Sequence, residues 1–233
     1  MFRFVQRLPI ILILSAAVIT IALVLSGCAS FPSNATPITG TRLIITMTVA
    51  GEIDPNLHYF VAFDTSGQAS PGPLPVVGPP WGNGWGTGNI TNYILFDGLQ
   101  PQGGYGVYRI VPGTNLLQNV FIGPPISFFT PPAGSNKLQF TLDLGQLATP
   151  TTPVTAIEQV NINFITTDII PVDPNFPGPK FFDGLGPTGN DFITISVNTS
   201  QIFNNTQTDI EPAGDVPLPN LDIVDWSVEV QAT

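Results

Sequence analysis

Cysteine and histidine are almost absent from this sequence, which contains only Cys28 and His58. A single cysteine excludes an intrachain disulfide framework, and a single histidine leaves a zinc site without a second imidazole ligand. The GxSxG and HExxH motifs of serine hydrolases and zinc proteases are also missing. His58 begins the strongly apolar segment HYFVAF, so we interpret it as structural rather than as a general base. These absences argue against most nucleophilic and zinc-dependent mechanisms.

Long apolar runs are missing too, except at the N-terminus. Arg3 and Arg7 precede an apolar segment of 18 residues, Leu8–Leu25, which small residues follow. A basic start, an apolar centre and a small-residue end are typical of a secretory signal peptide. An uncleaved transmembrane anchor is the alternative, because 18 residues are just long enough to span a bilayer.

The end of this apolar run favours the signal peptide. The sequence LSGC, Leu25–Cys28, resembles the lipobox of bacterial lipoproteins. The resemblance implies that residues 1–27 are removed, that Cys28 carries fatty acids such as palmitate, and that the protein is extracytoplasmic. It also implies a lipid anchor in the cell membrane or outer membrane, and Ala29 resembles the pattern of lipoproteins sent to the outer membrane. Residues 28–41 are rich in Ser, Thr and Pro and predict a flexible tether.

Charged residues are scarce and mostly acidic. They make up 9% of the chain, against about 25% in an average soluble domain. After residue 27 only four basic residues remain against 16 acidic ones, a formal net charge of −12. Such a surface repels phosphate backbones, so we expect no nucleic-acid partner. The 16 phenylalanines nevertheless exclude a disordered chain, and the 23 glycines and 25 prolines indicate a fold rich in turns.

The pattern of apolar residues after Arg42 has a period of two. Apolar and polar residues alternate in five segments, namely 43–49, 137–144, 160–164, 193–197 and 224–230. Alternation of this kind is typical of antiparallel strands with one buried and one solvated face. HYFVAF is apolar on both faces and predicts a central strand. We therefore predict an all-β fold, a single jelly-roll-like antiparallel β-sandwich of about 9–11 strands over residues 42–233, with residues 146–156 crossing between its sheets.

The segment Gly78–Asn89 places two tryptophans among five glycines. Two interpretations remain open. The indoles can be buried as a lid over an open end of the sandwich core, or they can present flat faces to a sugar ring while amide and carboxyl groups bind hydroxyls. The candidate ligand-binding residues are Trp81, Asn83, Trp85, Asn89, Tyr93 and Asp97.

Carboxylates are the only plentiful reactive groups, and two roles are open to them. A structural calcium ion is the possible cofactor, because its ligands are oxygen atoms, but EF-hand spacing is absent. The candidate calcium ligands are Asp183, Asp191, Asp209, Glu211 and Asp215; the alternative is a set of solvated acidic turns. Asp64, Asp97 and Asp183 end strands, and two of them facing each other would permit glycoside hydrolysis.

The sequence as a whole favours a membrane-tethered binding or scaffold domain over an enzyme. The strand pattern is similar in style to sugar-binding β-sandwich modules of secreted bacterial proteins, which implies carbohydrate or another envelope component as partner. The alternatives are a carboxylate-based glycoside hydrolase and a purely structural envelope protein.

Overall fold

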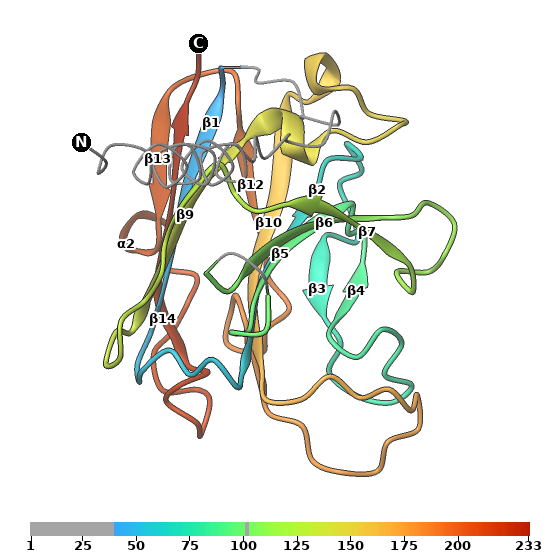
Figure 1. The fold of residues 1–233 in the computed structure, drawn as a ribbon, viewed down its shortest axis with the longest axis vertical. Coiled ribbons are helices and arrows are strands. Elements are labelled where there is room, and N and C mark those ends of the chain that lie inside the picture. The colour runs from blue at the N-terminus through green and yellow to red at the C-terminus, as the bar shows by residue number, and fades with distance from the viewer. Residues whose placement is uncertain (1–39, 101–102) are drawn as a thin grey trace, which may run out of the picture. The chain divides into compact units, whose positions relative to one another are not determined.

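The computed structural model describes residues 40–100 and 103–233, and Figure 1 shows their arrangement. The described strands are β1 (Arg42–Val49), β2 (His58–Asp64), β3 (Pro73–Pro75), β4 (Gly86–Gly88), β5 (Asn92–Phe96), β6 (Tyr105–Ile110), β7 (Asn119–Gly123), β8 (Ser127–Phe129), β9 (Lys137–Asp143), β10 (Gln159–Thr167), β11 (Phe182–Gly184), β12 (Ile193–Ser196), β13 (Gln201–Asn204) and β14 (Ile223–Gln231). The described helices are η1 (Leu144–Leu147), η2 (Val154–Ala156) and α2 (Asn205–Thr208). The predicted signal peptide, Cys28 and the tether up to residue 39 lie outside the described residues.

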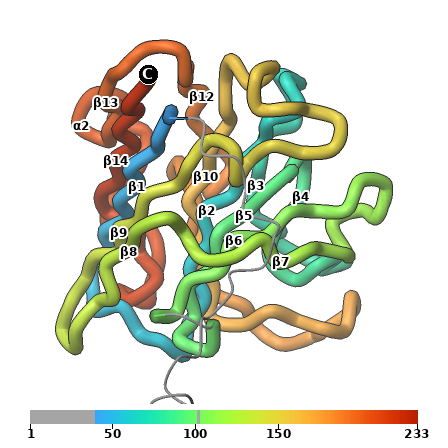
Figure 2. The backbone as a smooth tube through the Cα atoms, turned by 45° about the horizontal axis from the view of Figure 1, so that its top comes forward, coloured from blue at the N-terminus to red at the C-terminus, as the bar shows by residue number. Residues whose placement is uncertain are grey.

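The strands form two main antiparallel sheets and a small hairpin. Sheet A has the order β13-β14-β1-β9-β8, sheet B has the order β11-β10-β2-β5-β6-β7 with β12 also paired to β10, and β3 pairs with β4. The chain leaves sheet A after β9 and enters sheet B at β10 (Figure 2), so residues 146–156 form the predicted crossover. HYFVAF forms β2, between β10 and β5, as a central strand should.

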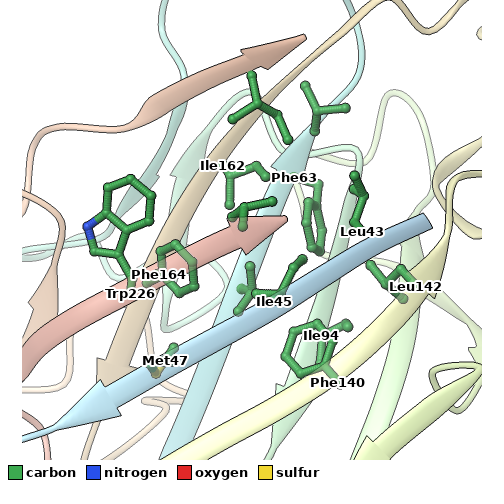
Figure 3. Packing of buried hydrophobic residues seen from close by; sticks show 14 of the residues in the cluster. Leu43, Ile45, Met47, Phe63, Ile94, Phe140, Leu142, Ile162, Phe164 and Trp226 are labelled. Carbon is green, nitrogen blue, oxygen red and sulfur yellow. The ribbon is translucent and has the colours of Figure 1, made fainter. Parts of the chain in front are cut away.

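Apolar side chains fill the space between sheets A and B. Trp226 of β14 stacks on Phe164 of β10 with ring centroids 5.7 Å apart, and Tyr105 of β6 meets Phe140 of β9 edge-on. Figure 3 shows Phe140 and Trp226 beside the central strand β1, with Ile45 between them. The two sheets therefore share one core, and the fold is the all-β sandwich that the sequence predicts.

The period-two alternation identifies the buried face of sheet A correctly. The apolar residues at alternate positions of β1, from residue 43 to residue 49, are all buried. In β14 the prediction fails at one position, because Ile223 rather than Val224 is buried. The register shifts at this point, where Thr48 pairs with Asp225 and Val49 pairs with Ile223. A β-bulge thus inserts one extra residue and moves the buried position.

The outer face of sheet B is covered, whereas the sequence predicts a solvated face. Asn161 and Asn163 of β10 lie on this face and are both buried. Asn163 donates a hydrogen bond to the carbonyl of Pro73 in β3 (2.9 Å) and accepts one from the backbone of Leu185 (3.0 Å). Asn163 is covered by β3, which packs on β10, and Asn161 donates to the carbonyl of Gln68 (3.2 Å) in the segment that follows β2. Polar residues with internal partners can occupy such a face at little cost.

The fourteen described strands exceed the predicted 9–11. The additional ones are segments of three residues, such as β3 and β4, which are too short to give an alternating pattern. In residues 40–100 and 103–233, no helix combines the length and the apolar character needed to cross a membrane.

Candidate functional site

The glycine-rich segment forms the loop between β3 and β4, and it folds onto the outer face of sheet B. The indole of Trp85 stacks on Phe60 of β2, with ring centroids 4.1 Å apart and an interplanar angle of 3°. Tyr93 of β5 packs against the same indole at 4.8 Å. Trp85 is only 5% exposed. The loop therefore closes a second apolar cluster on sheet B, not the open end of the sandwich core that the lid interpretation expects.

Trp81 is buried by a different part of the chain. Its indole nitrogen donates a hydrogen bond to the carbonyl of Phe176 (2.9 Å), and its backbone N–H donates to the carbonyl of Pro174 (2.9 Å). The ammonium of Lys180 lies 5.1 Å from the centre of the indole, within the range of a cation–π interaction. Burial lowers the pKa of Lys180 to about 8, against the opposing effect of Asp168. Trp81 thus joins the hairpin loop to residues 174–180.

Glycine is required in this loop where the backbone meets a neighbouring segment. Gly84 has a φ of +90°, which L-residues rarely adopt, and a Cβ there would lie 2.6 Å from Ile170. Its N–H donates to the carbonyl of Trp81 (2.7 Å). The close approach of Gly84 to residues 170–171 brings the two segments together beside Trp85.

Asn83 shapes the tip of the loop and leaves one polar group without a partner. Its side-chain oxygen accepts hydrogen bonds from the backbone N–H groups of Trp85 (3.0 Å) and Gly86 (2.8 Å). Its amide nitrogen, Nδ2, is buried and has no hydrogen-bond partner. A buried donor without an acceptor is costly, and in a cavity it is a candidate ligand contact.

A cavity of about 360 Å³ has Asn83 in its lining. Its lining is Phe60, Gly82, Asn83, Trp85, Tyr93, Leu95, Leu116, Leu117, Asn119, Ile170, Pro171 and Val172. We call this cavity the aromatic groove. None of its lining residues is charged, so it suits an uncharged ligand. Leu116 adopts a φ of 65°, a left-handed conformation that is strained for leucine and is often found at functional sites.

Three of the six predicted ligand-binding residues line the groove, namely Asn83, Trp85 and Tyr93. The other three lie outside its lining. Trp81 faces residues 174–180, Asn89 donates to the side chain of Gln68 at the surface (3.1 Å), and Asp97 lies 3.5 Å from the imidazole of His58. The sequence does not identify the groove residues 116–119 and 170–172, because they come from loops distant along the chain.

The three carboxylates considered for glycoside hydrolysis are not paired with one another. The register places Asp64 and Asp97 at opposite ends of the β2–β5 pair, a backbone separation of roughly 17–20 Å. Asp183 in β11 lies three strand spacings from β5, or about 14 Å. It is level with Tyr59 of β2, and Asp64 lies at the far end of that strand, roughly 16 Å along it. These backbone separations exceed the range of about 5–9.5 Å between the two carboxyl groups of glycosidases.

Asp183 instead meets two other carboxyl groups. Carboxyl oxygens of Asp183, Asp215 and Asp222 all lie within 4.8 Å of one another. Asp183 and Asp222 are buried, and Asp215 is exposed. Glu211 is also buried, and this burial, together with the charges of the three aspartates, raises its pKa. We call these four residues the acidic cluster; in the described part of the chain, none of them forms an ion pair with a basic residue.

Backbone donors fix the acidic cluster in place. Asp183 accepts hydrogen bonds from the N–H groups of Gly184 (2.8 Å) and Ile223 (2.7 Å). Both oxygens of Asp222 accept from Gly214 (3.0 Å each), and Glu211 accepts from Gly186 (2.7 Å). Burial is the main cause that raises the pKa of Asp183 to about 7 and that of Glu211 to about 9.

The cluster contains three of the five residues predicted as calcium ligands. The structure places the other two, Asp191 and Asp209, in the lining of a separate cavity of about 630 Å³. Sequence reasoning missed Asp222. The sequence gives little indication that Asp222 belongs to an acidic site, because an aspartate just before an apolar strand is usually interpreted as a solvated strand end.

Comparisons with known proteins identify no relatives. The sequence matches no family model, and no curated protein or solved structure shows significant similarity to it.

Proposed function

We propose that this protein is a bacterial lipoprotein whose β-sandwich binds an uncharged, hydroxyl-bearing ligand, with carbohydrate as the ligand class. The supporting observation is the aromatic groove, whose lining includes Trp85, Tyr93 and Asn83, the last with a buried Nδ2 that has no hydrogen-bond partner. Trp85 and Tyr93, each 5% exposed, contribute apolar wall to the groove, and an amide N–H is a donor suited to a hydroxyl oxygen. Apolar walls with a few convergent polar groups are typical of ligand sites.

The anchor in this proposal is the lipid on Cys28. The apolar segment, the small residues and LSGC follow one another in the order of a lipoprotein signal. The acidic chain after residue 27 would be repelled by anionic headgroups, so the lipid rather than a basic patch would hold it at the membrane.

Lipidation is tested by fatty-acid labelling. We expect the full-length chain, expressed in bacteria with its own signal, to enter the membrane fraction and incorporate labelled palmitate. Cys28→Ser removes the acceptor sulfur and is expected to abolish the label. Ser26→Ala keeps a small residue in the motif and should remain labelled. Label retained in Cys28→Ser would show that the anchor assignment is wrong.

Ligand binding is tested at Asn83. Asn83→Asp keeps the oxygen that accepts from Trp85 and Gly86 but removes the Nδ2 donor. We expect the full-length protein, screened on a glycan array, to bind at least one glycan. The loss of one hydrogen bond is expected to weaken that affinity about tenfold, as measured by titration calorimetry, without a large change in melting temperature.

The matched control is Asn89→Asp. It adds the same charge to the same glycine-rich segment, but Asn89 follows β4 and bonds Gln68 at the surface, outside the groove. Its affinity should stay near that of the wild type. The proposal fails if no glycan binds, or if the two variants lose affinity equally.

A further inference from the structure

The acidic cluster offers oxygen atoms of the type and spacing that calcium requires. Carboxyl oxygens of Asp183, Asp215 and Asp222 lie within 4.8 Å of one another. Calcium binds oxygen at about 2.3–2.6 Å, so two of its ligands are at most about 5.2 Å apart. The three oxygens are therefore close enough to share one ion.

Glu211 provides an independent indication that a cation binds here. This side chain is only 4% exposed. One of its oxygens accepts from the backbone of Gly186, whereas the other, Oε1, is buried without any hydrogen-bond partner. The charges of Asp183, Asp215 and Asp222 all act on Glu211, so its carboxyl group lies in their field. A buried carboxyl oxygen without a donor, beside three other carboxyl groups, is stabilised by a cation.

The cluster lies where the two sheets of the sandwich are joined. Asp183 belongs to β11 of sheet B and accepts a hydrogen bond from Ile223, the first residue of β14 in sheet A. Close to this point, Thr166 of β10 donates to the carbonyl of Leu221 (2.6 Å). Glu211, Asp215 and Asp222 all lie in the segment that connects α2 to β14. An ion bound here would hold that segment against β11.

We propose that Asp183, Asp215 and Asp222 bind one calcium ion beside Glu211, and that the ion clamps the segment before β14 of sheet A to β11 of sheet B. Calcium fits better than magnesium, which requires oxygen at about 2.0–2.1 Å in a near-octahedral arrangement and retains several water molecules. The site is separate from the aromatic groove, so its role is to stabilise the fold.

The test is the melting temperature of the full-length protein in detergent after removal of divalent ions by a chelator. An ion that binds only the folded state stabilises it in proportion to the logarithm of its concentration. For a domain of this size, calcium at 100 times its Kd should raise the melting temperature by about 5–10 °C. Calorimetry should give one calcium per chain. An equal shift with magnesium would contradict the assignment to calcium.

Two variants locate the site. Asp215 is exposed, so Asp215→Asn should fold and should weaken calcium binding at least tenfold. Asp209→Asn is the matched control: it is close in sequence and outside the cluster, and asparagine tolerates the left-handed backbone of Asp209, whose φ is 48°. It should keep the full calcium response. Glu211→Gln removes the charge of the buried neighbour and is expected to weaken calcium binding as well. The absence of any shift in the wild type, or equal responses of Asp215→Asn and Asp209→Asn, would overturn the proposal.

Discussion

Trp81→Ala is expected to lower the free energy of unfolding by about 3–5 kcal/mol, the usual cost of removing a buried tryptophan. Trp81 is 5% exposed, and the variant loses both the hydrogen bond to Phe176 and the contact with Lys180. Because Trp81 does not line the aromatic groove, this loss would reflect the stability of the fold and not ligand binding. Urea unfolding followed by fluorescence or circular dichroism measures it.

Two further substitutions define the origin of this effect. Trp81→Phe keeps an aromatic ring and loses the indole N–H, so a loss of about 1–2 kcal/mol is expected. Val77→Ala changes a side chain of the same loop that is 53% exposed, and it should alter stability by less than about 0.5 kcal/mol. A loss below about 1 kcal/mol for Trp81→Ala would show that the loop does not serve as a packed cover.

The sandwich core could be predicted from the sequence because its signal is local. Alternation in β1 and β14 separates a buried from a solvated face within each strand, and no knowledge of the partner strand is needed. The bulge opposite Thr48 and Val49 could not be predicted in this way. It depends on how β1 and β14, near opposite ends of the described chain, are paired.

The outer face of sheet B and the candidate sites depend on contacts that are distant along the chain. Trp85 is buried because its indole packs against Phe60 and Tyr93. Nothing in the sequence around these two residues shows that a tryptophan will pack on them. Asp183 meets Asp222 only because β11 and the start of β14 are brought together. The sequence could therefore predict a loop with two tryptophans and several acidic turns, but not which residues would meet.

Val228→Asp is expected to abolish the cooperative fold. Val228 is 0% exposed and lies in β14, an inner strand of sheet A, where it pairs with Ile45 of β1 and Phe203 of β13. Burial of an unpaired carboxyl group costs several kcal/mol whether the group is ionised or protonated, and a typical domain is stable by only about 5–15 kcal/mol.

Far-UV circular dichroism and thermal melting of the full-length protein test this expectation. The wild type should show a β-type spectrum and a cooperative transition, and Val228→Asp should lose the transition. The matched control is Gln231→Asp, which places the same carboxyl group at an exposed position of the same strand, opposite Arg42. The control should melt like the wild type, because its charge remains in water. A cooperative transition in Val228→Asp near the wild-type temperature would contradict this expectation. It would mean that residue 228 is not buried in an inner strand of the sandwich, because a buried carboxyl group lowers stability by far more than that.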